Sequence, residues 1–274
     1  MKIFTLILLF LSLLYSDINE QIKNSVQEFL GVQTYQKNKA LIELLFKNTN
    51  RFIYNNSVRD IEVLSTLKEN GLLPIYFKTP QNLEIEFYAK EHELLLIQLL
   101  DSTLRTMGYY KYFITESKRD KDYFSFAISM HTEYNIDPTL LKNLLYQRGC
   151  VIKNIDKVSQ TKWRYEFDVE NVKLDSQIIY ANQEVKINKP VYPILLNIED
   201  GKQISIYSSN GNHWYPNISL YDKYLNLIKL YQRDKKTKKL KFKFTDSSRY
   251  IKIGDLYQMN NLRYGLKINL QGER

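Results

Sequence analysis

From residue 80 to residue 172 the chain alternates between the hydrophobic period of a strand and that of a helix, and this alternation restricts the possible folds most. Residues 83–89 read Leu-Glu-Ile-Glu-Phe-Tyr-Ala, an alternation with period two that predicts a strand. Residues 91–107 repeat apolar side chains every three or four positions, which predicts a helix. Gly108 follows at the position where a left-handed helix cap is expected.

A second helix is predicted further along by its end signals. Asp137 has the side chain of a helix cap, Pro138 suits the first helical position, and Gly149 suits the end. Period-two segments before and after this helix predict four more strands, at residues 110–116, 123–131, 151–156 and 163–169.

The resulting order, strand-helix-strand-strand-helix-strand-strand, resembles the split βαβ, or ferredoxin-like, fold with one extra strand. In that fold two helices cover one antiparallel sheet. The resemblance implies an α+β domain over residues 80–174, and because it rests on element order it implies no activity. Small domains of this order recur in exported scaffold components of pili and secretion machines.

The segments on either side of this domain have other patterns. Residues 17–79 repeat apolar positions at helical spacing, interrupted at Gly31, and predict a helical region whose last helix is capped by Ser57. Residues 175–274 contain short strand-like runs separated by turn signals, which is typical of a β-sandwich. We therefore predict an α+β protein with a helical segment, a ferredoxin-like βαββαβ domain with an extra strand, and a C-terminal antiparallel β-sandwich.

Residues 1–16 have the pattern of a secretory signal peptide. Lys2 precedes an apolar run that ends at Leu14, and the small residue Ser16 stands before Asp17. The run is shorter than the about 20 residues that a membrane-spanning helix needs. We expect cleavage after Ser16 and a soluble protein in the periplasm or otherwise exported. An uncleaved, loosely anchored N-terminus is the alternative, because Leu14 suits the cleavage site less well than alanine.

Charge and cysteine content limit the partners. The chain has 39 basic and 30 acidic residues, a net charge of +9, which favours acidic envelope proteins, anionic glycans or a membrane surface. We expect no nucleic acid as partner of an exported protein. Because Cys150 is the single cysteine, an internal disulfide is excluded, and we expect a small buried side chain there.

Motifs for catalysis, metals and cofactors are absent from the sequence. The three histidines, His92, His131 and His213, lie in different predicted elements without the spacing of metal ligands. Neither a phosphate-binding glycine loop nor a nucleophile elbow is present. We therefore expect no metal, no cofactor and no catalytic residue.

The segment 212–215 is the first candidate binding site. His213, Trp214 and Tyr215 follow Asn212 in a polar loop, and such a group could bind a glycan, because aromatic rings stack on sugars while amide and imidazole groups meet hydroxyls. The alternative is that Trp214 anchors the core of the predicted sandwich.

A lysine-rich strand is the second candidate. Lys239, Lys241 and Lys243 alternate with apolar residues, so one exposed face would carry all three lysines. This face could dock an acidic partner, an anionic glycan or a membrane. It could also only protect a sheet edge from aggregation.

Aromatic residues of the predicted strands 110–116 and 123–131 are a third feature. RNA-recognition folds share this element order and stack bases on such rings, but the signal peptide argues against that function. We expect half of the rings to lie in the core. Any aromatic residues on the opposite face would be covered by the N-terminal helices or by a partner.

These observations predict an exported, non-enzymatic scaffold or adaptor that docks other cell-envelope components. A flagellar motor, a pilus or a secretion apparatus would be an assembly of this kind. A glycan- or cell-wall-binding module is the second hypothesis, and an envelope hydrolase is the third.

Overall fold

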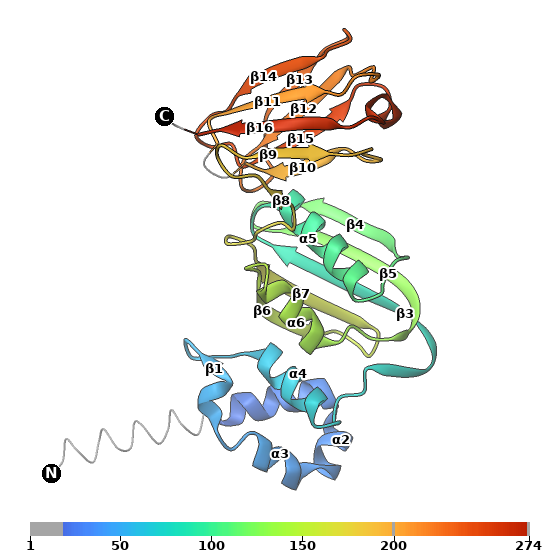
Figure 1. Ribbon diagram of the computed structural model, residues 1–274. Coiled ribbons are helices and arrows are strands. Elements are labelled where there is room, and N and C mark those ends of the chain that lie inside the picture. The colour runs from blue at the N-terminus through green and yellow to red at the C-terminus, as the bar shows by residue number, and fades with distance from the viewer. Residues whose placement is uncertain (1–18, 199–200, 273–274) are drawn as a thin grey trace, which may run out of the picture. The chain divides into compact units, whose positions relative to one another are not determined.

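The computed structural model describes residues 19–198 and 201–272, and the predicted signal peptide, residues 1–16, lies outside them. The described protein is mixed α+β, and its sheets are mostly antiparallel (Figure 1). It forms two compact units, one ending at Val172 and the other beginning at Lys173. None of the described helices has the length and the apolar character that a membrane span requires.

The first unit begins with short helices around apolar side chains. Residues 19–30 are helical, and Gly31, with a φ of 80°, interrupts the helical run as predicted. The prediction that Ser57 caps a helix is wrong, because Ser57 pairs with Tyr54 in a short hairpin and the helix begins later, at Asp60. The elements here are α2 (Val32–Lys37), α3 (Lys39–Leu45), η1 (Thr49–Arg51), β1 (Ile53–Tyr54), β2 (Ser57–Val58) and α4 (Asp60–Glu69).

Five strands of the first unit form one sheet in the order β4-β5-β3-β7-β6. Neighbouring strands are antiparallel except β3 and β7, which are parallel. The last strand, β7, therefore lies inside the sheet, and β6 forms the edge. The elements are β3 (Tyr76–Ala89), α5 (Glu93–Thr106), β4 (Phe113–Arg119), β5 (Phe124–Tyr134), α6 (Pro138–Tyr146), β6 (Val151–Lys157) and β7 (Lys162–Asp168).

The hydrophobic content of the last two strands explains their order. Trp163, Tyr165 and Phe167 of β7 are all buried, whereas Ile155 is the buried residue of β6. The strand with more apolar surface gains more by lying in the interior of the sheet.

The predicted end signals of α6 are confirmed. The Asp137 side chain accepts hydrogen bonds from the N–H groups of Thr139 and Leu140, at 3.0 and 3.2 Å, and Pro138 is the first residue of the helix. Gly149 has a φ of 79°. A Cβ atom at this position would overlap the carbonyl oxygen of Asn171, so glycine is required both for conformation and for space.

The helices α5 and α6 cover one face of the sheet, and the N-terminal helices extend this layer (Figure 1). The ring of Phe29 stacks on that of Trp163, with centroids 6.1 Å apart. Between the helices, Lys142 forms an ion pair of 2.8 Å with Glu62. Five strands about 4.8 Å apart are wider than two helices about 10 Å across, so further helices in the same layer are needed to bury the remaining apolar side chains.

The second unit contains two sheets, with the strand orders β13-β12-β15-β10-β8 and β14-β11-β16-β9. Their shared core includes Ile218 and Ile253 from the first sheet and Ile206 and Ile268 from the second. The short strands expected in residues 175–274 are present and form these two sheets. The elements are β8 (Gln177–Ile178), β9 (Glu184–Ile187), β10 (Ile194–Asn197), β11 (Gln203–Ser208), β12 (Pro216–Tyr221), β13 (Leu227–Gln232), β14 (Lys239–Lys243), β15 (Tyr250–Asp255), η2 (Met259–Leu262) and β16 (Leu266–Gln271).

Candidate functional site

The aromatic loop before β12 does not present its tryptophan to solvent. Trp214 is 0% exposed, and its indole N–H donates a hydrogen bond of 2.9 Å to the carbonyl oxygen of Gly254. Trp214 also belongs to the core cluster of the second unit. The expectation of a stacking face on Trp214 is therefore wrong, and its alternative, a core anchor, is correct.

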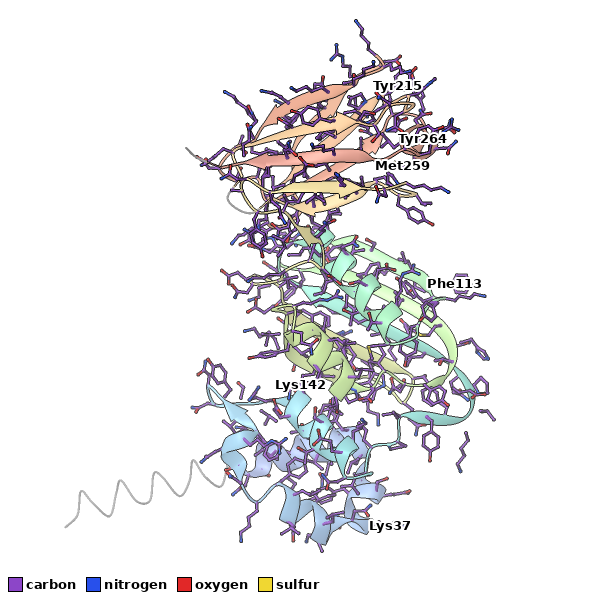
Figure 2. The ribbon with its side chains drawn as sticks, in the orientation of Figure 1. Lys37, Phe113, Lys142, Tyr215, Met259 and Tyr264 are labelled. Carbon is purple, nitrogen blue, oxygen red and sulfur yellow. The ribbon has the colours of Figure 1, made fainter. Side chains whose placement is uncertain are left out.

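The other two residues of the predicted glycan site lie in different environments. His213 is exposed, and Tyr215 is half-buried with its ring edge-on to Tyr257 at 5.1 Å (Figure 2 labels Tyr215). Successive side chains point to opposite sides, so His213 and Tyr215 point away from the core that contains Trp214. The three side chains therefore do not form one binding surface.

Hydrogen bonds from the backbone show what this loop does. The carboxylate of Asp255 accepts from the N–H of Tyr215 at 2.8 Å and from the N–H groups of Tyr257 and Gln258, both at 3.0 Å. The buried Asn212 side chain donates to the carbonyl oxygen of Gly265 at 2.7 Å. These buried polar groups join neighbouring loops, which is a structural role.

The lysine-rich strand has the predicted alternation. Leu240 and Phe242 of β14 are buried, whereas Lys239, Lys241 and Lys243 are exposed. Because β14 is the edge strand of its sheet, the lysines also suit the protective role that the sequence left open.

The register of this sheet adds two lysines that sequence reasoning did not connect with the strand. Lys239 pairs with Tyr207 of β11, Tyr207 with Lys267 of β16, and Lys267 with Lys186 of β9. Residues paired across neighbouring strands point to the same side of a sheet. We call the five exposed lysines on this side the lysine face: Lys186, Lys239, Lys241, Lys243 and Lys267.

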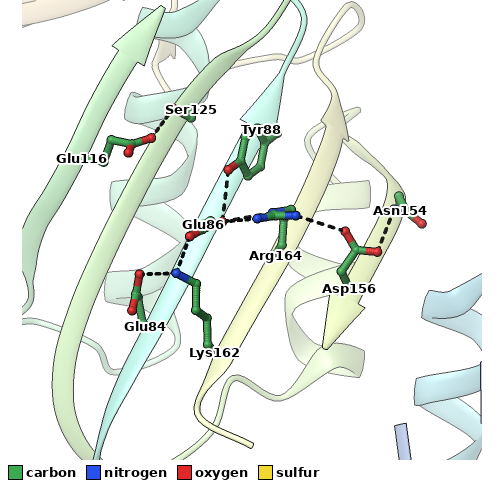
Figure 3. A network of polar contacts seen from close by, with 9 residues as sticks. All are labelled: Glu84, Glu86, Tyr88, Glu116, Ser125, Asn154, Asp156, Lys162 and Arg164. Atoms are coloured by element: carbon green, nitrogen blue, oxygen red, sulfur yellow. Dashed lines mark hydrogen bonds and ion pairs between the residues drawn. The ribbon is translucent and has the colours of Figure 1, made fainter. Parts of the chain in front are cut away.

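The open face of the five-stranded sheet carries charges of both signs, which bind one another (Figure 3). Lys162 lies 2.8 Å from a carboxylate oxygen of Glu84 and 2.7 Å from one of Glu86. Arg164 binds the second oxygen of Glu86 at 2.9 Å and lies 3.9 Å from Asp156. We call these five residues the charge ladder.

Mutual pairing explains the ionisation of the charge ladder. Burial alone would raise the pKa of Glu86, but hydrogen bonds from Lys162, Arg164 and Tyr88 lower it below its usual value. The carboxylate is thus held ionised by partners within the sheet. A group with this role stabilises the sheet and is a poor proton donor.

Several segments with exposed aromatic and aliphatic side chains meet at one end of the same sheet, where Phe113 and Ile114 point to opposite sides of the edge strand β4. The N–H of Asn135 donates a hydrogen bond of 2.8 Å to the carbonyl oxygen of Ile75. The carbonyl oxygen of Asn135 accepts one of 3.0 Å from the Tyr109 hydroxyl, so three segments meet there. Five residues of these segments have side chains that are 56 to 80% exposed, and Phe113, labelled in Figure 2, is the most exposed of them. We call this set the aromatic rim: Tyr76, Tyr110, Phe113, Ile114 and Tyr134.

The aromatic residues of β4 and β5 differ from the sequence expectation in their distribution. Phe124 and Phe126 are buried on the helix-covered side, as expected for half of the rings. The opposite side carries the charge ladder together with the rings of Tyr88 and Phe113, and in the described residues these two rings are not covered by the N-terminal helices. Sequence reasoning singled out the aromatic residues of 110–116, which include Tyr110 and Phe113, but did not connect them with Tyr76 and Tyr134, because these lie in separate segments.

Other potentially reactive side chains of the described residues do not form a site together. Cys150 is buried, and burial, with the negative charge of Asp168, raises the pKa of its thiol far above the usual value. Over residues 19–198 and 201–272, histidine, cysteine and acidic side chains form no group of three or more that could hold a metal ion.

The chain was compared with known proteins. No family model matches it, and no curated protein matches it significantly. Among solved structures, it is similar to the pre-peptidase C-terminal domain of the collagenase from Bacillus anthracis, with 14% identity and a TM-score of 0.25. The alignment covers 37% of this chain and 100% of that domain. A likeness with so low a TM-score supports no conclusion on function.

Proposed function

We propose that this protein is an exported, periplasmic, non-enzymatic scaffold or adaptor that docks other cell-envelope components. An assembly such as a flagellar motor, a pilus or a secretion apparatus would offer such partners. In this proposal, residues 80–174 form a ferredoxin-like domain with an extra strand, and residues 175–274 form an antiparallel β-sandwich. The element order of the first region and the shared core of two sheets in the second support these assignments.

The aromatic rim is the observation that carries the proposal. Aromatic residues are enriched at the centres of protein interfaces because they bury large areas at little entropic cost. Phe113 is 80% exposed and Ile114 is 60% exposed on β4, which is an edge strand. A partner that covers them would remove apolar surface from water and could bind the free edge of the strand.

Carboxylates of the first unit with a lowered pKa have structural partners, which supports a function without catalysis. The pKa of Asp101 is lowered although burial alone would raise it, because Arg105 and Tyr112 donate hydrogen bonds to it. The pKa of Asp168 is lowered by a hydrogen bond from the backbone of Glu170 and by Lys153. Such shifts mark an active site when the groups converge in a cleft, and these groups lie in separate ion pairs.

The test is site-specific photo-crosslinking in intact cells. A photoreactive amino acid is placed at Phe113 of the aromatic rim, and in a control protein at Tyr54, which is 68% exposed in the β1–β2 hairpin. We expect defined envelope proteins to be cross-linked from position 113 and not from position 54. The same adducts from both positions, or none from position 113, would contradict the proposal.

A second variant and cell fractionation complete this test. The double variant Phe113→Ser and Ile114→Ser should abolish the adducts formed from a crosslinker at Tyr110. Both residues are exposed, so the variant should change the free energy of unfolding by less than about 0.5 kcal/mol. Recovery of the protein in the cytoplasmic fraction would contradict export.

A further inference from the structure

We propose that the lysine face binds the surface of a membrane rich in anionic phospholipids. This inference concerns the second unit and does not depend on the aromatic rim. It begins from the regular pairing of β14, β11, β16 and β9, in which no register shift interrupts the sheet. An unbroken sheet holds its outward side chains about 4.8 Å apart from strand to strand.

The lysine face has one dominant row. Lys239, Tyr207, Lys267 and Lys186 follow one another across the four strands. The ammonium group of Lys239 lies 4.8 Å from the centroid of the Tyr207 ring, so the ring supports a cation beside it. A tyrosine between lysines is also a side chain that suits the boundary between water and lipid.

The charge of the lysine face is strongly one-sided. Five lysines stand against Glu184, which forms an ion pair of 2.7 Å with Lys267. In the described parts of the chain, Lys186, Lys241 and Lys243 form no ion pair. The face therefore keeps an excess of about four positive charges, and each lysine near an anionic membrane contributes about a fivefold gain in binding.

The kind of side chain favours lipid over an acidic protein. The centres of protein interfaces are depleted in lysine and enriched in aromatic residues and arginine. Among the described residues of β14, β11, β16 and β9, no arginine lies on the side of the lysine face, and Tyr207 is the one aromatic residue there. Lysine is a strongly hydrated point charge on a flexible stem, which suits a mobile array of head groups better than a fixed pair of carboxylate oxygens.

The experiment measures binding of the purified full chain to vesicles by sedimentation. One vesicle preparation contains 30% phosphatidylglycerol in phosphatidylcholine, and the other contains phosphatidylcholine alone. Binding is measured at about physiological salt, which screens the electrostatic attraction but does not remove it. The triple variant Lys239→Glu, Lys241→Glu and Lys243→Glu is compared with a control of equal charge, Lys223→Glu, Lys229→Glu and Lys252→Glu. The control lysines lie outside the lysine face. Because all proteins share residues 1–16, any binding by that segment cancels.

We expect the wild type and the control to bind the anionic vesicles, and the lysine-face variant to bind about a hundredfold more weakly. Binding of the wild type should also fall as salt rises from 0.05 to 0.5 M. Equal loss in both triple variants would show that net charge alone is responsible and would overturn the proposal. Equal binding to both kinds of vesicle would also overturn it.

An acidic protein as occupant would give a different result. In that case the wild type would not bind vesicles, whereas a photoreactive amino acid at Lys241 would cross-link to a protein in cells. That result would overturn the lipid proposal and leave the aromatic rim untouched. Conversely, vesicle binding without adducts at Phe113 would refute the scaffold function and support the lysine face.

Discussion

The indole N–H of Trp214 donates a hydrogen bond of 2.9 Å to the carbonyl oxygen of Gly254, in the interior of the second unit. This contact joins the loop before β12 to strand β15. An indole that is fully buried and hydrogen-bonded contributes packing and satisfies a carbonyl group that water cannot reach. The most site-like residue of the sequence is therefore part of the core.

The substitution Trp214→Ala should lower the free energy of unfolding by about 3–5 kcal/mol, because it leaves a large cavity and an unpaired carbonyl group. Chemical denaturation followed by circular dichroism measures this. Tyr192→Ala is the control, since this side chain is 80% exposed and its loss should change the stability by less than about 0.5 kcal/mol. A small effect at Trp214, together with loss of glycan retention, would instead restore the glycan hypothesis.

Asp60 gives the first unit a pH-dependent stability. Burial, with the negative charges of Glu28 and Asp156, raises its pKa to about 6, although the Ser25 hydroxyl donates a hydrogen bond to it at 2.7 Å. The unfolded value is about 3.9, so the folded state binds the proton more tightly between these pH values. Stability should therefore fall as the pH rises from about 4 to about 6 and stay level above that range.

The variant Asp60→Asn removes this titration. It should be more stable than the wild type at pH 8 by up to about 2 kcal/mol, and the difference should shrink as the pH falls through about 6 toward about 4. Loss of a negative charge in the first turn of α4 opposes the gain by about 0.5 kcal/mol. Melting temperatures from pH 5 to pH 8 measure the effect, and a constant difference across that range would contradict the assignment.

Glu86 should contribute more to stability than its neighbour Glu84. The Glu86 side chain is 14% exposed and binds Lys162, Arg164 and Tyr88, whereas Glu84 is 40% exposed and pairs with Lys162. We expect Glu86→Ala to cost about 2 kcal/mol and Glu84→Ala about 0.5 kcal/mol in urea denaturation. Equal costs would mean that the charge ladder is a set of weak surface pairs.

The thiol of Cys150 should react slowly with an aromatic disulfide reagent. At pH 8 we expect the native protein to react about a hundredfold more slowly than the protein in urea, because burial disfavours the thiolate and blocks access. Release of the coloured thiol product measures the rate. Fast reaction in the absence of urea would show that this part of the chain opens readily.

Local patterns of the sequence determined the elements that they belong to. The cap at Asp137, the left-handed glycine at Gly149 and the alternation of β14 are all present, because each depends on side chains within a few residues of one another. Ser57 shows the limit of this reasoning. Ser57 has the sequence pattern of a helix cap, but in the structure it pairs with Tyr54 in a hairpin, and the cap pattern contains no information about this pairing.

Only the tertiary structure decided the pairing and orientation of distant segments. The place of β7 between β3 and β6, the burial of Trp214 and the union of Lys186 and Lys267 with the lysines of β14 depend on contacts between residues far apart in sequence. A local pattern determines which side chains of a strand point to the same side. The burial of apolar surface in the whole fold determines which other strand lies beside it. The sequence by itself therefore determined the α+β character and the lysine strand, whereas the fold determined which surfaces remain available for binding.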